Sequence, residues 1–463
     1  MQIIALLPGL IAAYVAWMKS ARHAFFDVYL PVLILFPDYY RWIAPGLPDP
    51  TFSMAAIIPI AAIYFIKKRP GSPSWRFSFA DFLVCGYAFS VALSEYLNAG
   101  YNDAQNLMFE MICWVVLPYA LAKGMVEPEG LRVEFAKRMV WLFFLLSVGS
   151  VYEFKMGATP YRMILDRFFP GQADGWVTTF RWGFARIAGP YGHAILAGVI
   201  LITAYRIQRW LEWSGHWEPT FRKYHPIKQL TKARILTIGL FAGVIMTMVR
   251  GPWIGGFLAA VVIAIGKQKN RWMAVGVILA ALVVVGTPVG IMFYQYVSVG
   301  RAGAKTVAQE SAAYRKELID KYVAIVVQKS VFGWGRNYWP KVDGMTSIDN
   351  YYLLLALMHG LLALGFLVTI FVFFMWRLFW RGMNEPLSDP PGSSLSFTLL
   401  GIYWSILFSI ATVFMGNQLI PVFFLITGWA EGYLIWGKDA VAAAPQTTAE
   451  RPNSPYNFRR VLS

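Results

Sequence analysis

The chain has 463 residues, of which 57% are hydrophobic and 14% are charged, and its mean hydropathy is +0.50. A soluble core cannot bury so much apolar surface, so the composition excludes an ordinary soluble enzyme and indicates a protein that crosses a membrane many times. The formal net charge of +16 would suit a nucleic-acid ligand, but the basic residues lie between the apolar stretches, so we expect no nucleic-acid partner.

The apolar stretches recur along most of the chain, at lengths near the ~20 residues that cross ~30 Å of hydrocarbon. They predict an all-α, polytopic membrane helix bundle of about 12–13 transmembrane helices, in a single domain over residues 1–437. Two stretches, 26–44 and 52–66, could instead be re-entrant or interfacial. The expected spans are 2–18, 26–44, 52–66, 79–97, 107–122, 139–153, 187–204, 235–249, 253–266, 272–294, 351–376, 395–414 and 419–436.

The Lys and Arg residues predict the orientation of these spans, because cytoplasmic loops are enriched in positive charge. If the loops after every odd-numbered span up to the eleventh, together with the tail, are cytoplasmic, they hold 26 of the 41 Lys and Arg residues. Of the other 15, 13 fall in two long external segments, 152–186 and 295–350. The first span has Lys19 and Arg22 after it and no basic residue before it, which predicts an uncleaved span with its amino end outside.

Several remaining features narrow the function. Segment 205–234 mixes Trp and Tyr with seven Lys or Arg residues, which is typical of an anchor at the inner leaflet. The composition of residues 438–463 predicts a disordered cytoplasmic tail. Both cysteines, Cys85 and Cys113, lie in apolar spans, so neither a disulfide framework nor a cysteine metal site is expected. Without a Walker motif or a metal-binding spacing, we expect no ATP-driven pump, no metal and no cofactor.

Four polar residues stand where the chain re-enters the membrane from outside. Arg186, Arg250 and the pair Asp349 and Asn350 each precede or open an expected inward span. The amino end of a helix carries unpaired N–H groups and the positive end of the helix dipole, so it attracts anions. Arginines at such ends predict a phosphate site, although an arginine at the end of a span also snorkels to lipid head groups.

The long external segment contains an amphipathic pattern within residues 311–335. Leu318, Tyr322 and Val326 recur every four residues and predict a helix that lies on the membrane surface. Arg315 falls on the apolar side of this helix. An arginine turned toward the bundle requires a charged partner, and snorkelling is the alternative.

Asp349 and His193 are the candidate titratable groups. Asp349 and Asn350 both suit helix capping. A carboxylate that faces arginines stays ionised, yet it can orient a hydroxyl and accept its proton late in a reaction. His193 lies near Arg186 at the external end of its span, where it either contacts a substrate or packs between helices.

These residues stand in motifs that resemble the O-antigen ligase and polymerase superfamily over about residues 180–375. The matching pieces, in chain order, are RIAGPYGHA, VRGPWIGG, the long external loop with Arg315, VFGWG and IDNYYLLLALMHGLLALGF. The resemblance implies a multi-pass glycosyltransferase of the bacterial plasma membrane, with its active site on the external face. Its donor would be a glycan on undecaprenyl diphosphate, and its acceptor a hydroxyl of a glycan or lipid, in O-antigen or exopolysaccharide assembly.

The resemblance also implies roles for single residues. Arg250 and Arg315 would hold the diphosphate with Arg186 as a third arginine, and His193 and Asn350 would contact substrate. Ligases of the family often have His-Asn before the last large span, whereas this chain has Asp349, which leaves the base and the acceptor class open. Polymerase activity is slightly favoured over ligase activity, and polysaccharide-assembly proteins are candidate partners.

The chemistry of the donor agrees with such a site. A lipid diphosphate gains negative charge as its glycosidic bond breaks, so preorganised guanidinium groups stabilise the transition state more than the ground state. The main alternative is a transporter or flippase of lipid-linked glycans. A carrier, however, places ionisable residues along a path through the middle of the membrane.

Overall fold

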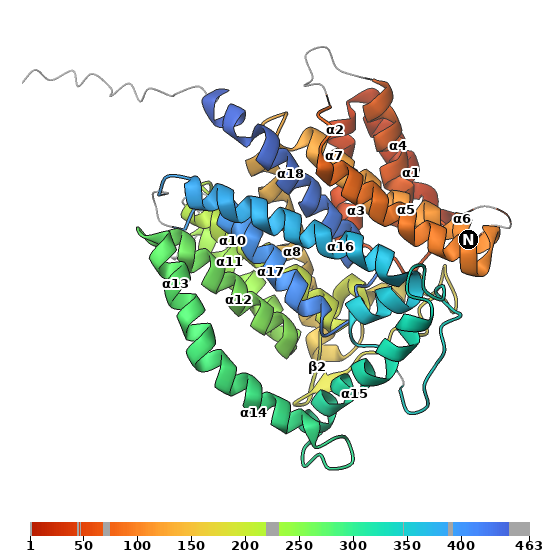
Figure 1. Ribbon diagram of the computed structural model, residues 1–463. Coiled ribbons are helices and arrows are strands. Elements are labelled where there is room, and N and C mark those ends of the chain that lie inside the picture. The colour runs from red at the N-terminus through yellow and green to blue at the C-terminus, as the bar shows by residue number, and fades with distance from the viewer. Residues whose placement is uncertain are drawn as a thin grey trace, which may run out of the picture.

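The computed structural model describes residues 2–43, 46, 48–67, 75–218, 231–345, 347–387 and 392–443. Within this part the chain is an all-α bundle of long helices, as predicted (Figure 1). The only strands among the described residues are the two-residue pair β1 (Phe180–Arg181) and β2 (Phe184–Ala185). Residues 444–463, most of the predicted disordered tail, lie outside the described residues, as does the middle of the expected basic anchor.

The helices follow one another with short connections; in the labels, η1 and η4 are 3₁₀ turns, and η2, η3 and η5 are π segments that continue their neighbouring helices. The first half of the chain contains η1 (Gln2–Leu6), α1 (Leu7–Met18), α2 (Ala21–Ala24), η2 (Phe25–Tyr29), α3 (Leu30–Leu35), α4 (Phe52–Ile66), α5 (Phe79–Ala99), α6 (Tyr101–Met111), η3 (Ile112–Val116), α7 (Leu117–Met125), α8 (Arg132–Met156), α9 (Pro160–Leu165), η4 (Gly189–Tyr191) and α10 (Ala194–Trp213). The second half contains α11 (Lys232–Met246), α12 (Arg250–Lys267), α13 (Arg271–Ala281), η5 (Leu282–Gly286), α14 (Thr287–Ser298), α15 (Val307–Gln328), α16 (Tyr351–Asn384), α17 (Leu395–Ile410) and α18 (Leu419–Ala443).

Each of the thirteen expected spans contains a helix. Seven helical stretches of the described chain are long and apolar enough to cross a membrane, and three more are apolar but shorter. One of the shorter ones is α4, a continuous helix that packs closely on α1, since a Cβ atom added at Gly9 would lie 2.7 Å from the Ala55 carbonyl oxygen. In the doubtful span 26–44, the helix ends at Leu35.

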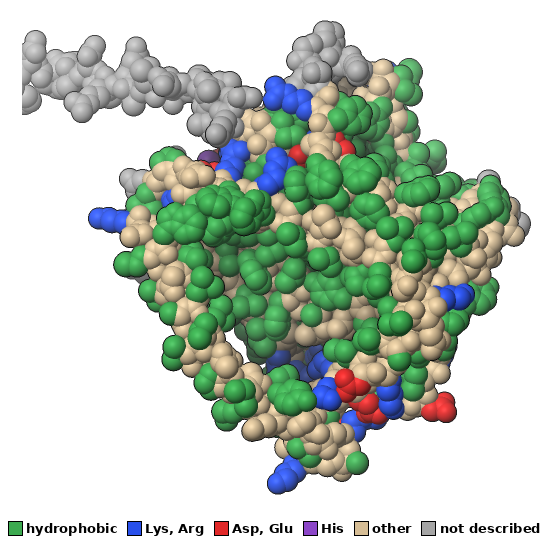
Figure 2. Space-filling view, in the orientation of Figure 1, with side chains coloured by type: hydrophobic (Ala, Val, Ile, Leu, Met, Phe, Trp, Pro, Cys, Tyr) green, Lys and Arg blue, Asp and Glu red, His purple; other side chains and the backbone are tan. Residues whose placement is uncertain are grey.

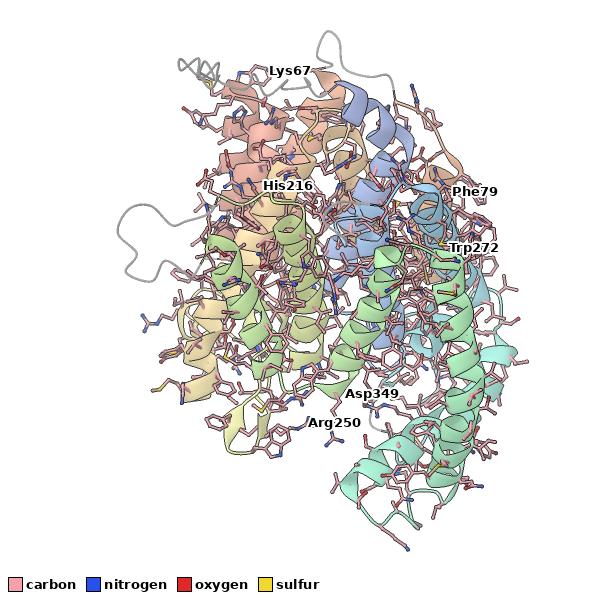
Figure 3. All side chains as sticks on the ribbon, turned by 90° about the vertical axis from the view of Figure 1, so that its left-hand side faces the viewer. Lys67, Phe79, His216, Arg250, Trp272 and Asp349 are labelled. Carbon is pink, nitrogen blue, oxygen red and sulfur yellow. The ribbon has the colours of Figure 1, made fainter. Side chains whose placement is uncertain are left out.

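The loops fall at the two ends of the bundle as their charges predict. Lys67, His216 and Trp272, from segments expected inside, lie at one end, and Arg250 and Asp349 lie at the other (Figure 3). Helices that alternate in direction place every second loop at the same end. Arg250 and Asp349, both expected outside, therefore share one end of the molecule.

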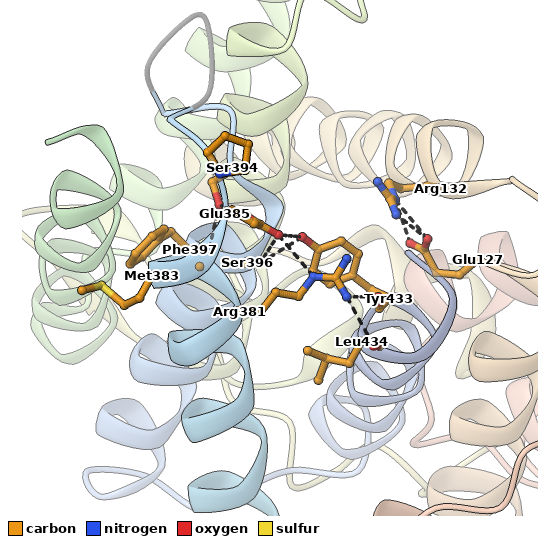
Figure 4. A network of polar contacts seen from close by, with 12 residues as sticks. Glu127, Arg132, Arg381, Met383, Glu385, Ser394, Ser396, Phe397, Tyr433 and Leu434 are labelled. Atoms are coloured by element: carbon orange, nitrogen blue, oxygen red, sulfur yellow. Dashed lines mark hydrogen bonds and ion pairs between the residues drawn. The ribbon is translucent and has the colours of Figure 1, made fainter. Parts of the chain in front are cut away.

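A polar network at the end opposite Arg250 joins the last three long helices (Figure 4). The Glu385 carboxylate, just after α16, accepts hydrogen bonds from the Ser394 hydroxyl at 3.0 Å and the Ser396 hydroxyl at 2.9 Å, and also from the Tyr433 hydroxyl. The Arg381 guanidinium donates to the Tyr433 carbonyl at 2.8 Å. This network fixes the end of α16 against α17 and α18.

The helix formed by α13, η5 and α14 stands away from the bundle (Figure 1). Its side chains are largely exposed, with Val283 at 68% and Val284 at 71%, which suits a surface that faces hydrocarbon. Its first residue, Arg271, anchors it by donating to the Gly382 carbonyl at 2.7 Å. Between this helix and the bundle, Figure 2 shows a hollow with mainly hydrophobic walls and Lys or Arg side chains at the end toward α15.

Helix α16 is broken at Gly360, which has φ 76° and ψ 179°. Residues 330–335 cross the break and satisfy the backbone groups on both sides of it. The Trp334 N–H donates to the Leu357 carbonyl at 2.8 Å, and the Leu361 N–H donates to the Ser330 carbonyl at 2.6 Å. Only glycine fits here, because a Cβ atom would lie 2.1 Å from the Val331 carbonyl oxygen.

The predicted amphipathic helix is present as α15. Leu318, Tyr322 and Val326 are buried as the spacing predicts, but they pack on protein rather than on the membrane surface. Their partners include Ile348, just before α16, and Leu357, in the first half of α16. The long external segment therefore has a small core of its own, which holds α15 beside the first half of α16.

Candidate functional site

Arg250 is the first residue of α12, and its side chain is exposed. Figure 3 shows it at the same end of the bundle as Asp349. No side chain caps the amino end of α12, and among the described residues no hydrogen bond or ion pair engages the Arg250 guanidinium. A guanidinium and a helix amino end are thus both open to an anion at one point.

The turn just before Arg250 is held in an uncommon conformation. Met248 has φ 50°, which is rare for a residue with a side chain. The Arg181 guanidinium donates to the Met248 carbonyl at 2.6 Å, and the Arg186 Nε donates to the Thr247 carbonyl at 3.3 Å. Both arginines therefore satisfy carbonyls at the carboxyl end of α11, where the helix dipole also favours a cation.

Arg186 does not open a helix, contrary to the expected span from 187. Helix α10 begins only at Ala194, and the intervening residues form a short 3₁₀ turn. The N-cap is His193, whose Nδ1 accepts from the Ile195 N–H at 3.2 Å. The two glycines of this stretch impose the difference, because Gly189 and Gly192 have positive φ values of 56° and 67°, which interrupt a helix.

His193 lies within electrostatic reach of two other predicted residues. Burial is the main cause that lowers its pKa, the positive charge of Arg186 lowers it further, and the carboxylate of Asp349 acts in the opposite direction. Burial, followed by the neighbouring charge of Arg181, also lowers the pKa of Arg186. Arg186 and Asp349, from two separate stretches of sequence, thus both lie within electrostatic reach of His193.

Asp349 and Asn350 have separate partners. The Asn350 side chain caps α16 by accepting from the Leu353 N–H at 3.2 Å. The Asp349 carboxylate accepts from the Ser347 hydroxyl at 2.9 Å and forms no ion pair with another described residue. Capping therefore does not account for Asp349, which leaves a half-buried carboxylate at the end of the bundle that also holds Arg250.

Arg315 lies on α15, which is fastened to the segment that precedes Asp349. Its neighbour Tyr314 donates to the Ser347 carbonyl at 2.6 Å and accepts from the Ser347 N–H at 3.1 Å. The Arg315 Nη1 reaches only the Ser311 hydroxyl at 3.4 Å, and its Nε is buried with no partner among the described residues. A buried donor without a partner is a group that a bound water molecule or anion would satisfy.

A comparison with known families finds a similarity over part of the chain. The family model for O-antigen ligase matches residues 235–368. This segment of the chain belongs to the O-antigen ligase family. It runs from α11 into α16 and contains Arg250, Arg315 and Asp349, whereas Arg186 and His193 precede it. A comparison with curated proteins gives no match.

Two further arginines near the O-antigen ligase segment were not assigned from the sequence. Arg181, on β1, holds the turn before Arg250. Arg301 donates to the Gly344 carbonyl at 3.0 Å, and its guanidinium lies 5.2 Å from the centre of the Tyr314 ring. The excess of positive charge in the two external segments was the signal in the sequence, but it could not single out these two residues.

The glycines of the O-antigen ligase segment have a packing role. A Cβ atom at Gly251 would lie 2.9 Å from the Thr412 hydroxyl, and one at Gly255 would lie 2.9 Å from the Ser405 carbonyl oxygen. These glycines let α12 approach α17. They are therefore explained by helix packing, without a ligand.

The site has two sides. Arg181, Arg186, His193 and Arg250 come from the bundle, and the long external segment supplies Arg315 and Asp349 in the fold that the small α15 core holds. Neither Arg250 nor Arg315 forms an ion pair with a carboxylate among the described residues. A bound anion could bridge the cations, and the Asp349 carboxylate could accept a proton from a neutral nucleophile.

Proposed function

We propose that the protein is a glycosyltransferase of the bacterial plasma membrane, which moves a glycan from undecaprenyl diphosphate to an acceptor hydroxyl at the external face. The O-antigen ligase match supports a membrane glycosyltransferase-like role in polysaccharide assembly. The finer proposal rests on the guanidinium of Arg250, which has no partner among the described residues at the amino end of α12. This group suits a diphosphate better than any neutral part of a glycan.

The reaction would proceed by displacement at the anomeric carbon. The acceptor oxygen forms a bond to that carbon while the bond from carbon to the diphosphate oxygen breaks. The electron pair moves to the diphosphate, where Arg250 and Arg315 stabilise the growing charge. Asp349 accepts the hydroxyl proton as the new bond forms. Because the diphosphate leaves as an anion, the step needs neither a general acid nor a metal ion.

The residues that bind the donor diphosphate do not determine the acceptor, which is either a growing glycan or a lipid. Transfer to a growing glycan would make the protein a polymerase, and transfer to a lipid would make it a ligase. We favour the polymerase slightly, with a carboxylate at Asp349 where ligases of the family often carry histidine. Neighbouring genes test this choice: a repeat-unit flippase and a chain-length protein accompany a polymerase, and lipid-core enzymes accompany a ligase.

Reconstituted transfer is the direct test. Purified protein in lipid nanodiscs receives the undecaprenyl-diphosphate glycan and an acceptor, without nucleotide and with EDTA, and the product is measured. We expect transfer by the wild type and its loss in Arg250→Ala. Arg138→Ala is the control, since Arg138 pairs with Asp27 at 2.8 Å and belongs to a loop expected inside. Full activity of Arg250→Ala would contradict the proposal, as would movement of the donor across liposomes without transfer.

A further inference from the structure

A second cavity, of about 800 Å³, lies at the opposite end of the bundle from Arg250. The junction of α1 and α2, the end of α4, the start of α5 and the helix α7 surround it. Its rim includes Lys67, which Figure 3 places at the end expected to face the cytoplasm. The cavity is therefore separate from the proposed transferase site and has the size of a small-molecule or lipid site.

The charged groups at the base of this cavity are already paired with each other. Lys123 is completely buried and donates to the two Asp81 carboxylate oxygens at 2.6 and 2.7 Å. The Tyr119 hydroxyl donates to the same carboxylate at 2.7 Å. Asp81 therefore neither repels an anion strongly nor needs a cation from a ligand.

The walls are apolar and aromatic. Trp75 lies between Phe65 and Phe77, with a distance of 6.4 Å between its ring centre and each of theirs. Phe65 is 50% exposed and Phe77 is 87% exposed, although both line the cavity. In a membrane protein such open aromatic walls provide a surface for hydrocarbon chains close to the head-group level.

The rim supplies positive charge. The Lys67 ammonium lies 3.6 Å from the centre of the Trp17 ring, which holds it in place without using an acidic partner. Lys19 is exposed, and its side chain makes no hydrogen bond or ion pair with another described residue. The third cation, Arg22, is paired with Glu134 at 2.8 Å. Glu129 also lines the cavity and has an interaction of its own. Among the described residues of the lining, Lys19 and Lys67 are the cations of the rim that form no ion pair.

We propose that this cavity binds an anionic glycerophospholipid of the cytoplasmic leaflet. Its phosphate would lie between Lys19 and Lys67, and its acyl chains would cover the wall formed by Phe65, Trp75 and Phe77. A basic rim above apolar walls, at the end of the bundle rich in Lys and Arg, matches the two halves of such a lipid. Lipid binding in this cavity does not depend on the transferase reaction, so each proposal can be tested without the other.

Cys85 provides a probe inside the cavity. It lines the cavity and is exposed, whereas Cys113, the other cysteine of the chain, is buried. The experiment measures the rate at which a maleimide modifies Cys85 of the full chain in detergent micelles, with added phosphatidylglycerol or phosphatidylcholine. We expect phosphatidylglycerol to slow the reaction at least about fivefold more than phosphatidylcholine, and high salt to remove the difference by screening the lysines.

Two variants complete the test. The double variant Lys19→Gln, Lys67→Gln should lose the protection by phosphatidylglycerol, with a lipid affinity at least about tenfold weaker. Lys267→Gln is the matched control, because the Lys267 ammonium lies 3.8 Å from the centre of the Trp213 ring but lines no part of this cavity. Equal protection by both lipids, protection that survives high salt, or protection retained in the double variant would each overturn the proposal.

Discussion

Asp349 and Asn350 are neighbours with different partners. Substitutions at the two positions should therefore affect different properties, the transfer rate at Asp349 and the stability of the fold at Asn350. Asn350 caps α16, whereas Asp349 bonds only to the Ser347 hydroxyl among the described residues. We predict that Asp349→Asn lowers the transfer rate about 10²-fold or more, the usual contribution of a positioned base, with little change in melting temperature. Asn350→Ala should instead lower the free energy of unfolding by about 1 kcal/mol. Normal turnover by Asp349→Asn would remove the base role.

His193 gives the site a defined response to acid. Its pKa is lowered by burial and by Arg186, so below the ordinary value of about 6.5 the unfolded chain binds a proton that the folded chain does not. The stabilisation by neutral His193 is therefore complete above pH 6.5 and is lost as the pH falls toward the lowered pKa. We predict that His193→Gln, which keeps a side-chain acceptor, melts with a smaller difference between pH 7.5 and pH 5.5 than the wild type. An equal difference in the two proteins would contradict this.

The break in α16 positions the helix that follows Asp349. Gly360 has a conformation reserved for glycine, and the Val331 carbonyl oxygen occupies the place of a Cβ atom. We predict that Gly360→Ala lowers the free energy of unfolding by about 2–4 kcal/mol, from backbone strain and overpacking. Gly365→Ala, in the same helix but with open space at its Cβ, is the control and should melt like the wild type. A stable Gly360→Ala protein would show that the break is not required.

The helices themselves could be predicted from the sequence, because apolar length and the spacing of Leu318, Tyr322 and Val326 are local signals. The break at Gly360 could not, since a single glycine in an apolar run is common in membrane helices and only the crossing segment 330–335 explains it. The late start of α10 was missed for a similar reason. Gly189 and Gly192 stand at the start of the apolar run from 187, and only their positive φ values show that the helix begins later.

At the scale of the whole molecule, charge placement predicted which loops share an end, and Figure 3 agrees for its labelled residues. The sequence also indicated that Arg250, Arg315 and Asp349 belong to one site, through the family motifs. It could not reveal Arg181 as the support of the turn before Arg250, because that contact joins β1 to α11 across 67 residues of chain. It also gave no sign of the hollow beside α14 (Figure 2).

The central claim is that arginines from separate stretches bind one lipid diphosphate, and a binding measurement tests it most directly. The affinity of undecaprenyl diphosphate is measured in nanodiscs for the wild type, Arg250→Gln, Arg315→Gln and the control Arg138→Gln. Loss of one charge-assisted contact should weaken binding by about tenfold to a hundredfold in each of the first two variants, and the control should bind like the wild type. Wild-type affinity in Arg250→Gln and Arg315→Gln would contradict the account.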